Sequence, residues 1–369
     1  MHPIGGQGTK NLPPFQLKSL NYNLIFNGMK NVFTLLLTLI VSCSFAQDIH
    51  FSQYWAAPVA MNPAYTGKFN GLFRATFNYR NQWFTIPTMN SGSPYQTFQA
   101  SVDGNVLPTS LGNNRLGVGA MFFNDKAGNG ALQTNTGMVS IAYHQSVSQY
   151  GRSHLSFGIQ AGVVNKRINF QDLIFETQLD KYGWNPSLPN GEQYGGKSIL
   201  YPDVTIGAAF TSRPKDRFAF NFGYSLHHVA SPRESFIGDQ NNRLARRHVV
   251  QGGCEITAGY QDQWTISPVF LFMMQSNAQM YNLGVGVNYQ TTNENIGIYG
   301  GAFYRVKDAA VLNLGVDVYN ARIGISYDMN HSDLRGASKA QGAVELAIVY
   351  IFKKQNDTYI QYPSYCPKF

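Results

Sequence analysis

Two arginines, Arg74 and Arg80, lie in a segment where apolar and polar residues alternate strictly. Every second side chain of a strand points to the same face, so both arginines share a face with Thr76 and Asn78. Charges on an interior face are costly unless they are paired. The row therefore forms internal ion pairs, the interpretation we favour, or grips a carboxylate-bearing partner or passenger segment. The candidate internal partners are Asp103, Asp328 and Glu345.

Catalytic chemistry finds little support in the sequence. Ser225 and His227 form a Ser-x-His pair, but residues two apart on a strand lie about 7 Å apart, too far for a direct hydrogen bond without help from long side chains. His227 and His228 are adjacent, so a strand would point them to opposite faces, a poor geometry for one metal. The sequence contains no nucleophile elbow, no HExxH zinc motif, no paired CxxC and no phosphate-binding loop. We therefore expect no enzyme, no metal and no cofactor.

The composition narrows the protein class. Charged residues make up 13% of the chain, about half the roughly 25% usual for soluble domains. Aromatic residues reach 14%, and there are 36 glycines. Such aromatic content argues against a disordered chain. The net charge of +8 is spread without a block of five like charges, so nucleic-acid binding is not expected.

An apolar run at 32–41 follows Met29 and Lys30 and precedes Ser44-Phe45-Ala46. This pattern predicts a secretory signal peptide over 29–46, cleaved between Ala46 and Gln47. Residues 1–28 would then be an upstream extension that is not translated. An alternative interpretation makes 40–43 a lipoprotein box with an acylated cysteine. A pairing of Cys254 with Cys366 is left open, because the two carry no framework pattern.

The rest of the chain alternates apolar and polar residues in about fourteen segments, and period two predicts strands. The opposite faces carry Gly, Ser, Thr, Asn and Gln instead of the Lys and Glu of a soluble sandwich. Apolar outside and polar inside is the pattern of a transmembrane barrel with aromatic belts at the strand ends. We predict an all-β, antiparallel, closed barrel over 71–352. The expected strands are 72–80, 98–102, 116–122, 139–143, 155–163, 204–210, 218–224, 250–256, 264–274, 281–289, 296–305, 310–317, 323–327 and 344–352.

The predicted connections suggest an orientation. Those that follow odd-numbered strands are the longer set, and in bacterial barrels the longer loops face outward. Segments 168–200 and 229–247 should then lie outside the cell. With an even strand number, both termini are expected in the periplasm. The tail 353–369 is a candidate periplasmic contact or an unstructured end. Arg246 and Arg247 are expected to be a solvated pair or a contact for lipopolysaccharide phosphate.

Several short motifs resemble one family along the whole mature chain. They are Asp48 to Tyr54, Asn62-Pro63-Ala64-Tyr65-Thr66-Gly67, Tyr79 to Trp83, Tyr327-Asp328, Gly342 with Glu345, and Cys366-Pro367. Together they are similar to the PorP/SprF family of the type IX secretion system. The resemblance implies an outer-membrane barrel that serves protein secretion, gliding motility or both. It also implies partners: a periplasmic ring of lipoprotein and partner subunits, and a secreted adhesin-like substrate with its C-terminal domain.

The segment 47–70 precedes the first predicted strand. Proline fixes its own backbone and biases the residue before it toward extended geometry, so Asn62, Pro63 and Ala64 should form a turn that ends near Gly67. Asn-Pro-Ala also occurs in the N-terminal hatch of FadL-type channels. We expect 47–70 either to fold across the periplasmic mouth and occlude the lumen or to be a loose leader. Arg74, Asn78, Arg80 and Glu345 are the candidates for lumen-facing side chains.

Two functions remain open at this point. The first is an accessory outer-membrane barrel that docks, retains or delivers a secreted adhesin through protein contacts, with lipid around it. The second is a FadL-like channel for small hydrophobic solutes, which requires an apolar pocket in the lumen. The polar inward faces favour the first.

Overall fold

The computed structural model of this 369-residue chain describes residues 50–353, with gaps at 87–94, 107–110, 129–131, 149, 170–172, 174, 182, 186, 190, 192–197, 237–238, 294 and 334. The chain divides into two compact units, Met1–Ala46 and Gln47–Phe369, and every described residue belongs to the second. The predicted upstream extension, signal peptide and Ala46–Gln47 cleavage site lie outside the described residues. So do Cys366 and nearly all of the tail.

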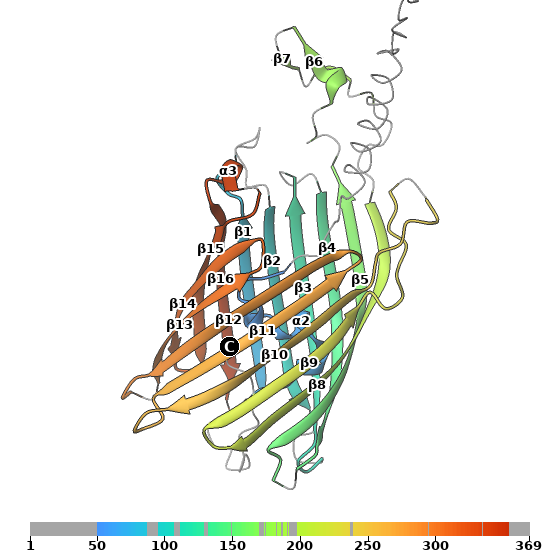
Figure 1. Cartoon of the computed structure of the whole chain (residues 1–369). Coiled ribbons are helices and arrows are strands. Elements are labelled where there is room, and N and C mark those ends of the chain that lie inside the picture. Colours follow the sequence, from blue (N-terminus) through green and yellow to red (C-terminus); the bar gives the residue numbers. More distant parts are fainter. Residues whose placement is uncertain are drawn as a thin grey trace, which may run out of the picture. The chain divides into compact units, whose positions relative to one another are not determined.

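Fourteen antiparallel strands close into a barrel (Figure 1). Each expected strand coincides with one barrel strand, so the predicted architecture is confirmed. The barrel strands are β1 (Phe73–Gln82), β2 (Tyr95–Val106), β3 (Arg115–Ala127), β4 (Leu132–Ser146), β5 (Ser153–Ile168), β8 (Ser198–Lys215), β9 (Phe218–His227), β10 (Arg247–Ala258), β11 (Trp264–Gln275), β12 (Ala278–Gln290), β13 (Ile296–Arg305), β14 (Ala309–Val318), β15 (Ala321–Asn330) and β16 (Gln341–Phe352). All neighbours along the chain pair, and β1 closes the barrel by pairing with β16.

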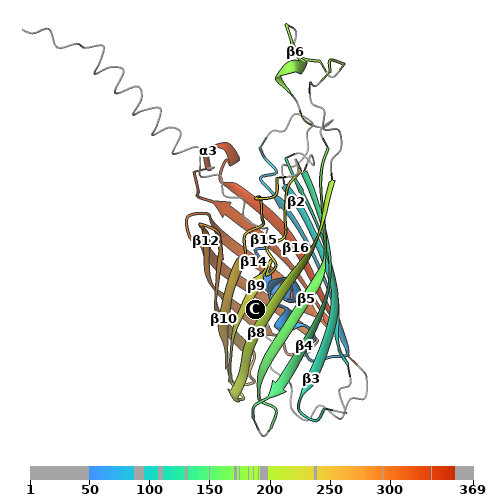
Figure 2. The ribbon, with the colours of Figure 1, turned by 90° about the vertical axis from the view of Figure 1, so that its right-hand side faces the viewer.

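The two ends of the barrel differ in their connections (Figure 2). One end, here the long-loop end, carries the connections 169–197 and 228–246. The first contains η4 (Glu176–Gln178), β6 (Leu179–Asp180) and β7 (Gly183–Trp184); α3 (Arg335–Ser338) lies before β16 at the same end. The opposite end, the short-turn end, includes the two-residue turn that joins β14 to β15. Tyr319 occupies this turn with φ 54, as tight hairpins require.

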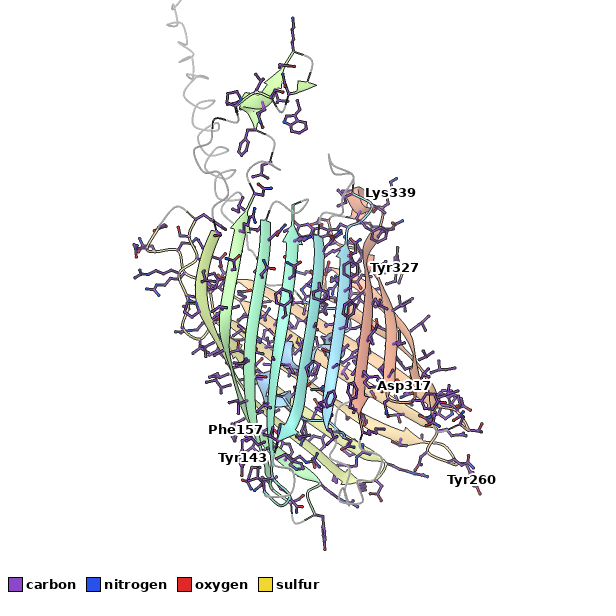
Figure 3. All side chains as sticks on the ribbon, turned by 180° about the vertical axis from the view of Figure 1, so that it is seen from behind. Tyr143, Phe157, Tyr260, Asp317, Tyr327 and Lys339 are labelled. Atoms are coloured by element: carbon purple, nitrogen blue, oxygen red, sulfur yellow. The ribbon has the colours of Figure 1, made fainter. Side chains whose placement is uncertain are left out.

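Side chains alternate between a buried inward row and an exposed outward row. In β1 the inward residues from Arg74 to Arg80 are at most 5% exposed, whereas outward Phe73 is 40% exposed. The outward apolar side chains suit contact with lipid. The closed barrel also suits a membrane, because closure leaves no strand edge without hydrogen bonds. Outward tyrosines cluster near both ends, as Tyr327 and Tyr143 illustrate (Figure 3). Among the tyrosines near strand ends, Tyr79, Tyr224 and Tyr327 lie at the long-loop end, and Tyr143, Tyr289 and Tyr350 lie at the short-turn end.

The segment before β1 supplies three short helices: η1 (Tyr54–Ala56), α2 (Pro58–Met61) and η2 (Pro63–Tyr65). The α2 helix falls within the barrel outline in two perpendicular views (Figures 1 and 2). Nearly every residue of 51–69 is buried. No helix in the described part of the chain is long and apolar enough to cross a membrane.

Candidate functional site

The N-terminal segment, residues 50–71, is bound to the inner barrel wall by a cluster of charges near the long-loop end. The backbone N–H groups of Ser52 and Gln53 each donate to one oxygen of the Glu345 carboxylate, both at 2.8 Å. The hydroxyl of Ser52 donates to the Asp328 carboxylate at 2.7 Å. These three bonds fix the start of the segment between the inward faces of β15 and β16.

Two arginines balance these carboxylates. Arg80 pairs with Asp328 at 2.9 Å and with Glu345 at 3.3 Å. Arg305 at the end of β13 pairs with Asp328 at 2.6 Å and also with Asp308. Arg80 also donates to the Ser52 hydroxyl at 2.5 Å. We call Arg80, Arg305, Asp328 and Glu345 the outer charge cluster.

The outer charge cluster is at most 2% exposed. An isolated charge so deeply buried would cost several kcal/mol, and mutual pairing removes most of that penalty. Residues on four strands therefore depend on one another, and the Ser52 hydroxyl stands between them. His50 lies beside the same cluster. Burial, followed by the charges of Arg305 and Arg80, holds the pKa of His50 well below its ordinary value.

Asn62 anchors the middle of the segment. Its side-chain oxygen accepts the N–H of Ala64 at 2.9 Å, which caps η2, the turn expected from Asn-Pro-Ala. Its amide nitrogen donates to the carbonyl oxygens of Ala208 and Tyr224, each at 3.2 Å. A single side chain thus joins the turn to both β8 and β9.

Glycines on the inner wall make room for this middle part. A methyl group added at Gly207 would overlap the Asn62 amide oxygen, and one at Gly158 would overlap the backbone of Pro63. One at Gly117 would overlap the carbonyl of Thr66. The wall and the segment are therefore complementary in shape, since glycine permits close backbone approach.

A second polar group holds the end of the segment near the short-turn end. The N–H of Gly67 donates to Asp103 at 2.7 Å, and Asp103 pairs with Arg74 at 2.7 Å. His144 on β4 lies 2.8 Å from the Thr66 carbonyl through Nε2. A carbonyl only accepts, so Nε2 carries the proton. The segment therefore runs from the long-loop half of the lumen to the short-turn half before it enters β1.

An apolar cluster covers the remaining wall. Tyr54 and Met61 of the segment pack against side chains from five consecutive strands, β10 to β14. Burial raises the pKa of Tyr54, whose hydroxyl has no partner among the described residues. The wall residues are Val249, Val269, Leu271, Met273, Met280, Phe303 and Val311. This apolar wall was not predicted from the sequence, because most residues on the expected inward faces are polar or glycine.

The structure brings most of the sequence-derived candidates together. Arg74 and Arg80 pair with Asp103, Asp328 and Glu345, the carboxylates named as internal partners. Asn78 is fully buried on the same row, and neither of its amide atoms has a partner among the described residues. Asn62, Pro63, Ala64 and Gly67 lie in the segment that the wall receives. Ser52 and Gln53 were missed as site residues, since no periodic pattern marks them. Arg305 was missed although it ends the expected strand 296–305.

The Ser225–His227 pair comes within hydrogen-bond distance through the length of the histidine side chain. The hydroxyl of Ser225 lies 3.2 Å from Nε2 of His227, because the long histidine side chain closes the gap. Arg247 donates to Nδ1, so the proton is on Nε2 and the ring cannot act as a base toward Ser225. Both side chains contact the carbonyl of Met61, at 2.8 and 3.2 Å. The pair therefore binds the end of α2, and the described residues contain no group of three or more metal-ligating side chains.

Comparison with known proteins decides the family. The sequence profile of the type IX secretion system membrane protein PorP/SprF matches residues 43–350. The chain belongs to the PorP/SprF family. No curated protein matches this chain. PorP/SprF membership makes the barrel an outer-membrane protein of type IX secretion.

Similar solved structures are all barrels with low sequence identity. The Ralstonia pickettii toluene transporter TbuX is 13% identical, with a TM-score of 0.46, over 80% of this chain and 94% of that chain. The Pseudomonas putida toluene transporter TodX is 9% identical, with a TM-score of 0.45, over 80% and 93%. A Pseudomonas aeruginosa FadL homologue is 10% identical, with a TM-score of 0.43, over 79% and 93%. Similarity at this level carries no argument about function.

Proposed function

We propose that this PorP/SprF barrel docks a secreted adhesin-like substrate, through its C-terminal domain, and delivers it to the cell surface. The observation that carries the proposal is that the protein's own segment, residues 50–71, occupies the lumen. It binds inward faces from β1 round to β16. A barrel filled in this way works through protein contacts at its ends instead of through an open pore.

The orientation supports the same role. We propose that the long-loop end faces the cell exterior, as in other bacterial barrels. β16 then ends on the periplasmic side, where the tail 353–369 meets the periplasmic ring of lipoprotein and partner subunits. We therefore propose a periplasmic location for the C-terminus and propose none for the N-terminus. Ser52 and Gln53 lie among the long-loop ends of the strands, so the start of the segment reaches the outer half of the lumen.

Crosslinking in native outer membranes tests the docking role. Photoreactive residues placed in the long-loop connections and in the tail should capture an adhesin C-terminal domain and ring subunits, respectively. Truncation after residue 353 should reduce recovery of the ring while the barrel stays inserted. Capture of neither class of protein would refute the proposal.

A channel for small hydrophobic solutes is the second candidate, and the apolar wall of β10 to β14 favours it. Tyr54 and Met61 cover that wall, so solute passage requires the segment to move. We propose that residues 47–67 occlude the lumen. Their deletion should raise the flux of small solutes through reconstituted barrels; unchanged flux would show that the segment does not occlude. Uptake of aromatic solutes by the intact protein would favour the channel over docking.

A further inference from the structure

The connection between β9 and β10 carries three exposed arginines, Arg233, Arg243 and Arg246. Arg233 and Arg243 face each other in an antiparallel bridge within this connection. Like charges in directly opposite positions are destabilising. The three side chains, here the arginine triad, therefore concentrate positive charge on one small surface.

No carboxylate among the described residues neutralises the arginine triad. The Glu234 carboxylate forms an ion pair with Lys166, and the Tyr201 hydroxyl donates to its other oxygen at 3.4 Å. Asp239 accepts the N–H of Asn241. Arg243 donates to the Ser231 carbonyl at 3.3 Å and Arg246 to the Val229 carbonyl at 3.0 Å. These bonds orient two guanidinium groups without cancelling their charge.

One histidine–carboxylate contact and one ion pair fix the frame that presents the triad. The connection begins at His228, whose Nδ1 lies 2.8 Å from the Asp203 carboxylate on β8. The Lys166–Glu234 pair ties its middle to β5. The triad is thus held in place before any ligand arrives, which lowers the entropy cost of binding.

The triad lies just beyond the aromatic belt. Outward Tyr224 contacts His248 at 2.9 Å, which marks the belt on β9 and β10. Arg246 lies two residues before His248, immediately before the first residue of β10, and its side chain is exposed. Arg247, by contrast, faces inward toward His227. The yellow connection projects beside the barrel wall in Figures 1 and 3.

We propose that the arginine triad binds the phosphate groups of outer-leaflet glycolipid. Guanidinium groups bind phosphate through paired N–H donors, and neighbouring arginines match the charge of a diphosphorylated headgroup. The position beside the wall, one step beyond the belt, is where lipid phosphates lie. A site for an acidic protein partner would instead be expected over the barrel opening. The site is separate from the lumen and does not depend on adhesin docking.

Binding of diphosphoryl lipid A to the purified full chain in detergent tests this site, with enzymatically dephosphorylated lipid A as the matched ligand. Each basic residue near a charged lipid surface contributes about fivefold in affinity. R233Q/R243Q should therefore weaken binding of diphosphoryl lipid A by about tenfold or more. R233K/R243K, which keeps the charge, should lose less. Heat-modified mobility on gels checks that every variant is folded.

K215Q/R217Q removes two exposed charges at the short-turn end and is the matched control. It should bind within twofold of the parent protein. The proposal is overturned if R233Q/R243Q also binds within twofold, if dephosphorylated lipid A binds equally well, or if the control loses as much. Equal competition by the same concentration of inorganic phosphate would assign the site to free phosphate and overturn the lipid claim.

Discussion

The Glu345 carboxylate offers the sharpest test of how the N-terminal segment is held. Glu345→Gln keeps the shape and removes the charge. One amide oxygen still accepts an N–H from Ser52 or Gln53, but the amide nitrogen then faces the second N–H donor. Hydrogen bonds to charged groups contribute about 1.5–3 kcal/mol each, and breaking a buried pair costs more. We expect the segment to lose about 2–4 kcal/mol, which corresponds to about 30- to 1000-fold faster local opening.

Amide hydrogen exchange in lipid nanodiscs measures this opening directly. Exchange of residues 50–54 should accelerate by the stated factor, while the barrel strands keep their protection. Glu255→Gln is the matched control, because Glu255 is a buried inward carboxylate paired with Arg213 on β8. The reasoning is refuted if residues 50–54 exchange within threefold of the parent rate. Uniform loss of protection across all strands would refute it as well, since Glu345 would then serve barrel closure instead of the segment.

Three further perturbations probe the same segment, each followed by the rate of protease cleavage within residues 50–71. Gly207→Ala should displace Asn62, lower the docking free energy of the segment by about 2 kcal/mol and so speed cleavage. Gly137→Ala is the control and should leave the cleavage rate unchanged, because the space around Gly137 is open. Equal cleavage rates for the two variants would contradict the close fit between the wall and the segment. Lowering the pH below about 6.5 should reduce the docking free energy of the segment by up to about 1.4 kcal/mol per pH unit, because His50 is neutral when docked and takes up a proton only after release. A His50→Asn variant should lose this pH dependence. Cleavage of the parent protein at a rate independent of pH would refute the reasoning. Tyr54→Phe should stabilise the docked segment by about 1 kcal/mol and so slow cleavage, because the buried hydroxyl lacks a partner among the described residues. Faster cleavage would indicate that the hydroxyl has a partner.

The barrel itself was predictable from local sequence. A lipid-facing row and a lumen row alternate with period two, and each expected strand overlaps an observed one. The internal ion pairs were also predictable from the sequence. A buried arginine row requires carboxylate partners, and the inward faces contain only a few carboxylates. Arg80 and Glu345 even face each other in the register of β1 and β16.

The path of the N-terminal segment was not predictable from local sequence. Residues such as Ser52 and Gln53 bind through backbone N–H groups, which carry no side-chain signature. The receiving glycines look like any others in a glycine-rich chain, and only closure of the sheet places Gly158 and Gly207 opposite the turn. The apolar wall was missed for a related reason: its side chains come from five strands, with three from β11 and one from each of the other four.

The segment that lies in the lumen is followed at once by β1, and β1 must meet β16 to finish the barrel. The last seam therefore closes around the beginning of its own chain. Since Ser52 and Gln53 bind Glu345 on β16, the segment ties the beginning of the chain to the final strand beside this seam. The N-terminal residues thus brace from inside the one seam that joins strands from opposite ends of the barrel sequence.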